Sequence, residues 1–204
     1  MSEVERLVTR ILLESGAVLF GEFRLASGRV SHVYVDLRRV LGFPRHFRTI
    51  VSLMSGEVAK LVKEDDAVVA GVATGGIPWA TAVAVALGLP LAYVRPPKGH
   101  GTERSVEGAD VSGKEVVLID DVATSGGSLL SSVEALRSMG ASSITAFVIV
   151  DREQGAAQAL AAAGVSLRGI VTLRSILEEA HRQGVITEAQ LEALSKELWG
   201  TKGT

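Results

Sequence analysis

The run from Val116 to Ser128, VVLIDDVATSGGS, constrains the fold more than any other part of the chain. It opens with aliphatic residues typical of a strand buried on both faces, and the expected strand ends at Ile119, where two carboxylates follow. A turn of glycine and hydroxyl residues comes next, and then the apolar spacing of a helix over residues 128–138. A strand, a tight turn and a helix in this order predict one unit of a parallel α/β sheet.

Strands and helices alternate in the same way along most of the chain. The apolar patterns predict strands at residues 67–72, 91–94, 115–119, 143–150 and 167–172, with helices between them at 77–87, 128–138 and 154–163. The flanking patterns predict helices at 3–15, 44–63, 174–182 and 187–198 and short strands at 18–20, 22–25 and 33–36. The predicted fold is α/β, with a central parallel sheet flanked by helices and a ligand site beyond the carboxyl ends of the strands.

Composition argues against several classes of function. The chain has 204 residues, enough for one domain with a sizeable core, and its net charge of −2 argues against a nucleic-acid partner. It has no cysteine, which excludes disulfides and thiolate chemistry. Residues 67–94 carry no charge, but glycines and prolines divide them into the strand, helix and strand of a buried α/β unit rather than a membrane span. The charged amphipathic N-terminus is unlike a signal peptide, so we expect a cytoplasmic protein with no membrane partner.

The turn after Asp121 has the composition of a phosphate cradle. Glycines let the main chain approach a phosphate, the first N–H groups of the following helix are unpaired, and the helix dipole favours negative charge there. Thr124, Ser125 and Ser128 add hydroxyl donors. The acidic pair suits the vicinal hydroxyls of a ribose attached to that phosphate. Alternatively, Asp120 and Asp121 only end a strand and the glycines only make a tight turn, but the whole block in this order favours a sugar phosphate.

This block, residues 120–128, resembles the motif with which type I phosphoribosyltransferases bind 5-phosphoribosyl 1-diphosphate (PRPP). Ser125 stands where many members have a second threonine, which keeps the hydroxyl. The resemblance implies the type I phosphoribosyltransferase fold, with Mg²⁺ bound mainly through PRPP and no metal site made by protein side chains alone. It assigns PRPP binding to Asp120, Asp121, Val122, Ala123, Thr124, Ser125, Gly126, Gly127 and Ser128.

A second turn of small residues, around Thr74 and Gly75, follows the expected strand at 67–72. By itself, a tight turn between a strand and a helix explains its glycines. In the resembled family this turn binds the pyrophosphate of PRPP through main-chain amides, which implies that Thr74 and Gly75 contact PRPP. Some members that use orotate have a lysine near Gly75, so the resemblance does not extend to that side-chain contact.

Residues 95–110 change abruptly from apolar to charged and glycine-rich, which predicts a surface loop. Their Lys-Gly-His-Gly sequence resembles part of the lid of orotate phosphoribosyltransferases, although Pro96 replaces a lysine of that lid. The resemblance implies that Arg95, Lys98 and His100 bind PRPP and that the lid reaches the partner's site in a homodimer. The alternative is an ordinary solvated hairpin.

Arg152 follows the expected strand at 143–150, and its planar guanidinium can hold a carboxylate through two hydrogen bonds. The run from Asp151 to Ala156 resembles the Asp-Arg-Glu-x-Gly-Ala segment of orotate phosphoribosyltransferases. This resemblance implies that Arg152 and Thr124 bind orotate. Alternatively, Asp151 and Arg152 form a surface ion pair of little energetic consequence.

Residues 20–31 resemble the hood that covers the base in the same family, although Ala26 replaces a frequent lysine. The resemblance implies that Tyr34 and Val35 contact the pyrimidine through their main chain. It also implies one phosphoribosyltransferase domain over residues 1–204, divided into a hood at about 15–40, a core at about 44–175 and C-terminal helices at 174–198.

Together these resemblances imply an orotate phosphoribosyltransferase that converts orotate and PRPP to orotidine 5′-monophosphate and pyrophosphate in de novo pyrimidine (UMP) biosynthesis. Asp120 and Asp121 are expected to stabilise positive charge at C1′, and Lys98 and His100 to stabilise the departing pyrophosphate. One alternative is a phosphoribosyltransferase for a purine or another base, against which Arg152 argues because a purine has no carboxylate. Another is a non-catalytic PRPP-binding regulator.

Overall fold

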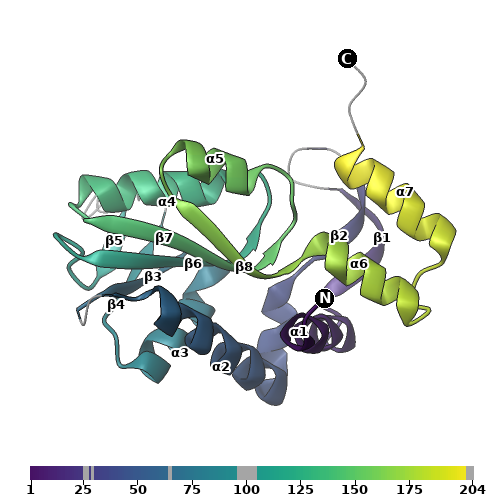
Figure 1. The fold of residues 1–204 in the computed structure, drawn as a ribbon, viewed down its shortest axis with the longest axis horizontal. Helices are drawn as coiled ribbons and strands as arrows, with labels where there is room; N and C mark the ends of the chain where they lie inside the picture. The colour runs from purple at the N-terminus through teal and green to yellow at the C-terminus, as the bar shows by residue number, and fades with distance from the viewer. Residues whose placement is uncertain (25–27, 29, 64–65, 96–104, 201–204) are drawn as a thin grey trace.

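The fold is organised around a six-stranded sheet with the strand order β5-β4-β3-β6-β7-β8 (Figure 1). A computed structural model of the chain describes residues 1–24, 28, 30–63, 66–95 and 105–200. All neighbouring strands of the sheet run parallel except the edge strand β5, which is antiparallel to β4. The strands are β3 (Val68–Val72), β4 (Leu91–Val94), β5 (Val106–Gly108), β6 (Glu115–Ala123), β7 (Ser143–Asp151) and β8 (Ser166–Thr172).

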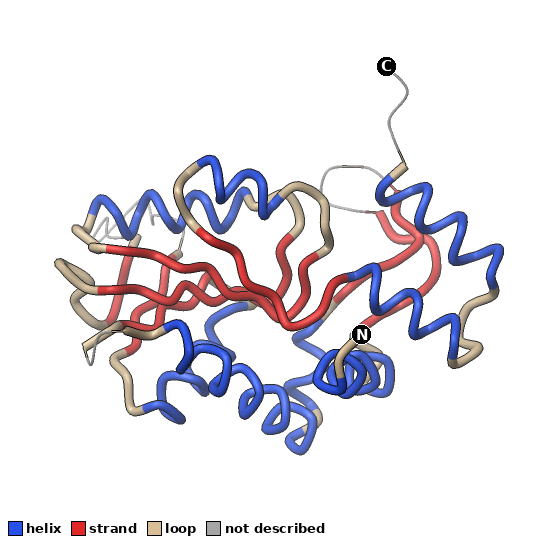
Figure 2. Tube along the Cα trace, viewed as in Figure 1, coloured by secondary structure: helices blue, strands red, loops and turns tan. Residues whose placement is uncertain are grey.

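Helices cover both faces of this sheet, and a two-stranded hairpin lies beside it (Figure 2). The hairpin, called the hood below, pairs β1 (Val18–Arg24) with β2 (Val30–Val35). The helices are α1 (Glu3–Glu14), α2 (Pro44–Leu61), α3 (Gly76–Leu87), α4 (Gly127–Ser138), α5 (Ala156–Ala162), α6 (Leu173–Arg182) and α7 (Glu188–Trp199), with a 3₁₀ helix η1 (Leu37–Gly42) after the hood. This architecture confirms the predicted α/β fold with its mostly parallel sheet.

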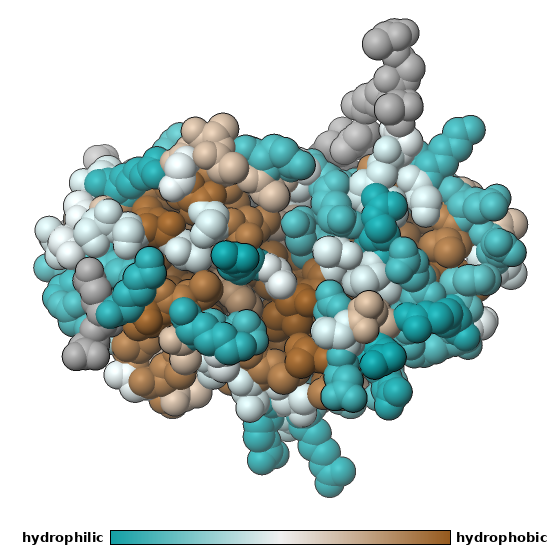
Figure 3. Space-filling view, in the orientation of Figure 1, coloured by the Kyte–Doolittle hydropathy of each residue, from teal (hydrophilic) through white to brown (hydrophobic). Residues whose placement is uncertain are grey.

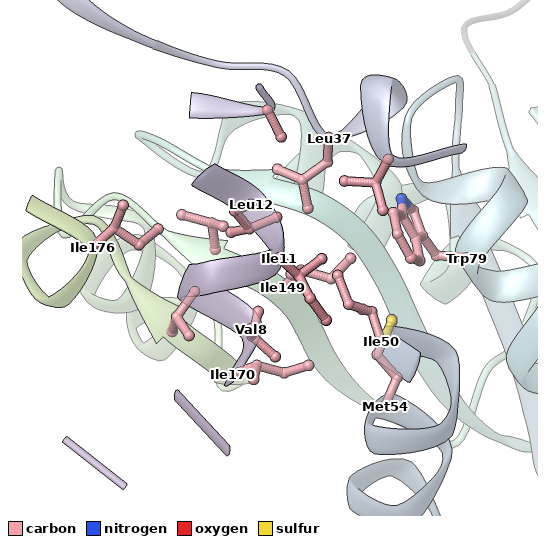
Figure 4. Close-up of a cluster of buried hydrophobic side chains, with 14 of the residues drawn as sticks. Val8, Ile11, Leu12, Leu37, Ile50, Met54, Trp79, Ile149, Ile170 and Ile176 are labelled. Atoms are coloured by element: carbon pink, nitrogen blue, oxygen red, sulfur yellow. The ribbon is translucent and has the colours of Figure 1, made fainter. Parts of the chain in front are cut away.

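Alternating residues of the strands pack into two separate hydrophobic cores, because successive side chains of a strand point to opposite faces of the sheet. Val117 and Ile119 of β6 join the core beneath α1, α2, α3 and α6, whereas Val116 and Leu118 join the core beneath α4 and α5. In the first core, side chains from α1 and α2 converge on Ile149 of β7 (Figure 4). The sheet is buried on both faces, as the aliphatic strand sequences predict.

Two boundaries near the site differ most from the sequence prediction. Strand β6 continues past Ile119 to Ala123, because its last residues still pair with the end of β7, so the acidic pair lies within the strand. Helix α5 begins at Ala156, two residues later than expected, since Glu153 and Gly155 have φ angles of 54° and 108°, which a right-handed helix does not allow.

Strand β5 lies inside the segment expected to be a surface loop, and it pairs with β4 through three residue pairs. The hood also has one first strand where the sequence predicts two pieces, with a shift of register between Phe20 and Phe23. The uncharged residues 67–94 form β3, α3 and β4. Within the part of the chain that the structure describes, no helix has the length and apolar character needed to cross a membrane.

Candidate active site

The candidate site lies where β3, β6 and β7, three neighbouring parallel strands, end at the same edge of the sheet. The loops after these strands are tied to the adjacent strands by main-chain hydrogen bonds. Ala73 N–H donates to Val94 O at 2.8 Å, and Arg152 N–H donates to Ala123 O at 2.9 Å. The fold therefore holds the turn at 73–76, the loop at 124–127 and the segment after β7 close together.

The loop after β6 encloses a cavity of about 180 Å³ at the start of α4. Gly126 makes the turn with a φ of 86°, and a Cβ at this position would come within 3.1 Å of Ala156 Cα. The first hydrogen bond of the helix joins Leu130 N–H to Gly126 O, so the preceding N–H groups have no partner within the helix. The cavity is lined by Asp120, Val122, Ala123, Thr124, Ser125, Gly126, Gly127, Ser128 and Leu129.

The turn after β3 approaches β6 so closely that only glycine fits. A Cβ on Gly76 would collide with the main-chain carbonyl of Ile119, and a Cβ on Gly75 would lie 2.5 Å from an oxygen of Asp121. The peptide bond between Ala73 and Thr74 is cis. Gly75 therefore leaves room for the Asp121 carboxylate at the position where some relatives are expected to have a lysine.

The two carboxylates of the acidic pair lie in different surroundings. Asp120 is 8% exposed and lines the cavity of the phosphate loop, whereas Asp121 lies against Gly75. One oxygen of Asp120 accepts a hydrogen bond from Asp121 N–H at 2.9 Å, and one oxygen of Asp121 accepts from Val122 N–H at 2.9 Å. These contacts orient both side chains at the end of the strand.

Burial shifts the acid–base behaviour of both groups. Desolvation, reinforced by the neighbouring charge of Asp121, raises the pKa of Asp120 to about 8. Desolvation also raises the pKa of Asp121, although hydrogen bonds and the positive charge of Arg38 oppose that rise. When carboxylates are kept out of water, their electrostatic attraction to a positive charge placed beside them is strengthened.

Arg152 is nearly buried, with 7% of its surface exposed, and its main chain is held on both sides. Its N–H is bonded to β6, and its carbonyl oxygen accepts a hydrogen bond from Trp199 Nε1 at 3.0 Å. In the hood, Tyr34 packs its ring against Phe23 with the ring centroids 5.5 Å apart, and Val35 contacts the first core. Tyr34 and Val35 thus occupy the end of β2 that leads into η1.

Arg95 is already engaged in an ion pair, because its Nη2 lies 2.7 Å from Glu107 Oε1 on β5. It lines a second cavity of about 340 Å³ beside Ser128 and Ser131, rather than the cavity of the phosphate loop. Lys98 and His100 lie outside the residues that the structure describes, as do Pro96 and Ala26.

Two residues near the site are absent from the sequence-based assignment. Arg38 of η1 bonds to Asp36 at 2.6 Å, and its charge acts on Asp121. Trp199 is remote in sequence but bonds to Arg152. No motif in the sequence marks either residue, since both reach the site only through tertiary contacts.

The donor set for a metal ion is limited. Within the described ranges, no three His, Cys, Asp or Glu side chains form a group that could hold a metal. Asp120 and Asp121 supply the oxygen atoms that Mg²⁺ prefers, but this ion usually takes one or two carboxylates together with phosphate groups of the substrate. The residues present fit an ion that is carried mainly by a phosphorylated ligand.

Comparison with known proteins identifies the family. Residues 42–166 match the family described as phosphoribosyl transferase domain. The chain is 46% identical over 178 residues to the orotate phosphoribosyltransferase of Aeropyrum pernix, covering 87% of this chain and 95% of that protein. A crystal structure of orotate phosphoribosyltransferase from Aeropyrum pernix matches with a TM-score of 0.76 and 44% identity, over 88% of this chain and 99% of that chain.

Two further structures are similar. Orotate phosphoribosyltransferase of Mycobacterium tuberculosis in complex with PRPP matches with a TM-score of 0.69 and 30% identity, over 85% of this chain and 98% of that chain. UMP synthase of Leishmania donovani matches with a TM-score of 0.82 and 31% identity. That match covers 97% of this chain and 42% of the Leishmania chain. The chain therefore belongs to the orotate phosphoribosyltransferases of the type I phosphoribosyltransferase family.

Proposed function

We propose that this protein transfers the phosphoribosyl group of PRPP to orotate, giving orotidine 5′-monophosphate and pyrophosphate in pyrimidine biosynthesis. The observation that carries the proposal is the cavity of the phosphate loop, which has Asp120 on its wall and lies beside Arg152. A phosphate in this cavity meets the free N–H groups at the start of α4 and the hydroxyls of Thr124, Ser125 and Ser128. The attached ribose then extends toward the acidic pair.

The acidic pair supplies the electrostatic part of the mechanism. The bond between C1′ and the pyrophosphate oxygen breaks, with its electron pair leaving on pyrophosphate, while N1 of orotate supplies the pair for the new bond and releases its proton to solvent or to the departing pyrophosphate. Positive charge develops on the ribose ring during this exchange. Asp120 and Asp121 bind the ribose hydroxyls. The positive charge that develops at C1′ lowers the pKa of Asp120 and so favours the carboxylate form, which stabilises that charge.

Arg152 fixes the acceptor. Its guanidinium binds the carboxylate of orotate, and the main chain of Tyr34 and Val35 contacts the pyrimidine. Positioning of this kind lowers the barrier because it holds N1 close to C1′. The PRPP contacts also include Thr74 and Gly75 for the pyrophosphate, and Arg95 with Lys98 and His100 from the lid.

Magnesium enters this proposal together with PRPP. When bound, Mg²⁺ would neutralise negative charge on the pyrophosphate and orient it for departure. Asp120, on the wall of the cavity, and Asp121, beside Gly75, would supply oxygen ligands to such an ion.

A homodimer completes the proposal, with the lid of one protomer reaching the partner's site. Helix α3 has the sequence GIPWATAVAVAL, which carries apolar residues on all sides, and such a helix is normally covered all round. Yet Val85 on this helix is 79% exposed. Figure 3 shows apolar residues gathered in this part of the visible face. A second copy of the chain would cover them.

The test compares orotate with uracil, which lacks only the carboxylate. We expect the protein with PRPP and Mg²⁺ to consume orotate, followed by its ultraviolet absorbance, with much lower kcat/KM for uracil. Arg152→Ala should lower the preference for orotate over uracil by about 10- to 100-fold, since a charged, two-bond contact is lost. Arg168→Ala, which changes an exposed arginine of β8, is the matched control and should keep the wild-type preference.

Two results would contradict the proposal. Turnover of adenine or guanine without turnover of orotate would keep the fold and reject the substrate. Tight binding of PRPP with no turnover of any base would identify a PRPP-binding regulator instead of an enzyme.

A further inference from the structure

Helix α7, the last helix of the chain, contacts β2 of the hood on one side and α6 on the other (Figure 1). Leu194 anchors it in the first hydrophobic core, and Leu191, Leu198 and Trp199 pack partly buried against the same core. Beyond this anchor, its C-terminal turn makes polar contacts with two segments that are far apart in sequence. One of these segments follows β7, and the other is β2 of the hood.

The first set of contacts holds the segment that contains Arg152. Trp199 Nε1 donates to the carbonyl oxygen of Arg152 at 3.0 Å. The guanidinium of Arg174, from the first turn of α6, lies 4.2 Å from the centre of the Trp199 ring, and its Nε lies 3.4 Å from Glu153 Oε2. One indole thus fixes the main chain of Arg152, and one cation joins that indole to the next residue, Glu153.

The second set of contacts holds the hood. Glu197, two residues before Trp199, accepts from His32 N–H at 3.0 Å and contacts His32 Nδ1 at 2.7 Å. His32 lies opposite the register shift between Phe20 and Phe23, where the hairpin ladder is interrupted. The carboxylate of Glu197 therefore accepts a hydrogen bond from His32 N–H at the point where the pairing between β1 and β2 is interrupted.

Packing alone does not fix this helix against the hood. A cavity of about 340 Å³ remains between them, lined by Phe20, Gly21, His32, Ile186, Gln190, Ala193, Leu194 and Glu197. A gap of this size leaves the apolar contact incomplete, so the polar contacts at Glu197 and Trp199 carry more of the positioning.

We infer that α7 is a brace that sets the distance between the hood and Arg152, and that Trp199 and Glu197 are positioning residues for the base. The inference rests on the proposed function, in which Arg152 binds orotate and the hood contacts the pyrimidine. The two halves of the base site come from separate parts of the chain, and α7 is bonded to both. Neither Trp199 nor Glu197 is required to touch PRPP.

The test measures KM for each substrate separately in two variants. Trp199→Phe keeps a ring beneath Arg174 but removes the N–H that bonds to Arg152, and Glu197→Ala removes both contacts to His32. We expect each variant to raise KM for orotate about threefold to tenfold, the range of one hydrogen bond, while KM for PRPP and kcat change less than twofold. Glu192→Ala makes the same change on an exposed site of α7 and serves as the control.

The double variant tests whether both contacts act through one brace. Combining Trp199→Phe with Glu197→Ala should raise KM for orotate by less than the product of the single effects, because the second change acts on a helix already released. Thermal melting of each variant checks that it is folded. Equal shifts in both KM values, or no shift in either, would overturn the brace. Absence of orotate turnover in the wild type would reject the proposed function itself, and the inference with it.

Discussion

Asp120 and Asp121 are neighbours in sequence but meet different parts of the site. The side chain of Asp120 lines the cavity of the phosphate loop, and that of Asp121 fills the space left by Gly75. Both carboxyls are largely buried, and burial raises the pKa of each. The protein therefore keeps an electrostatically unfavourable pair ready for a cationic ligand or transition state, at a cost in stability.

The destabilisation of the folded state by Asp120 should depend on pH. The pKa of Asp120 is raised to about 8, above its value of about 3.9 in an unfolded chain. The folded state thus binds the proton more tightly, and this carboxyl lowers the free energy of unfolding as pH rises from about 4 to 8. We expect Asp120→Asn to raise Tm of the protein without substrates by about 2–8 °C at pH 9 and to change it little at pH 4.

The same variant should lose activity, because an amide cannot stabilise positive charge at C1′. Asp110→Asn, at an exposed position in a turn, is the control for the chemical change itself. A Tm difference between Asp120→Asn and wild type that is equal at pH 4 and pH 9 would contradict this account of Asp120.

Among the elements, the loop between β6 and α4 depends most on a single backbone geometry. Gly126 has a φ of 86° and leaves no room for a Cβ beside Ala156. Gly113 has a similar φ of 71°, but a Cβ at this position would meet nothing within 4 Å. Substituting each glycine in turn therefore separates the effect of backbone strain on stability from the effect of a displaced phosphate loop on PRPP binding.

We expect Gly126→Ala to lower the free energy of unfolding by about 1–3 kcal/mol and to raise KM for PRPP at least about tenfold. Strain and contact with Ala156 both displace the loop whose N–H groups would hold the phosphate. Gly113→Ala should lower stability alone and leave KM for PRPP unchanged. The two quantities are measured by thermal melting and by initial rates at varied PRPP. Unchanged KM for PRPP in Gly126→Ala would show that this loop does not hold the phosphate.

The sequence was sufficient to predict most elements because their periodicity is strong. The aliphatic run at 116–119 and its small-residue turn identified β6 and the phosphate loop. Periodicity could not show that β6 continues through the acidic pair, since that extension depends on pairing with β7. It also missed β5, whose three residues become a strand only beside β4. The start of α5 depends on the φ of 108° at Gly155, which the helical apolar spacing of the following residues does not reveal.

At the scale of the whole molecule, the arrangement of the hood and the C-terminal helices could not be predicted from local patterns. The contacts between His32 and Glu197 and between Trp199 and Arg152 join residues 165 and 47 positions apart. No periodicity encodes such pairs. The fold class, by contrast, follows from the alternation of strands and helices alone. The apolar surface of α3 likewise emerges only in the structure, where Val85 is exposed, because the sequence predicts a buried unit over residues 67–94.

We expect the wild type to be a dimer in solution and Val85→Asp to weaken that dimer by about tenfold to a hundredfold, because a carboxylate without a partner is costly to bury. Size-exclusion chromatography with light scattering, over a range of protein concentrations, measures the change. Met139→Asp alters another exposed apolar residue, at the end of α4, and should leave the dimer intact. A monomeric wild type, or equal behaviour of both variants, would contradict an interface at α3.

Trp199 also lies where its intrinsic fluorescence can report on the candidate site. The chain has two tryptophans, and Trp79 is fully buried in the core. Trp199 lies beneath the guanidinium of Arg174 and bonds to the main chain of Arg152. Its emission therefore responds to the geometry of the segment that would hold the base. Assembly of that half of the site can be followed by intrinsic fluorescence, without any attached dye.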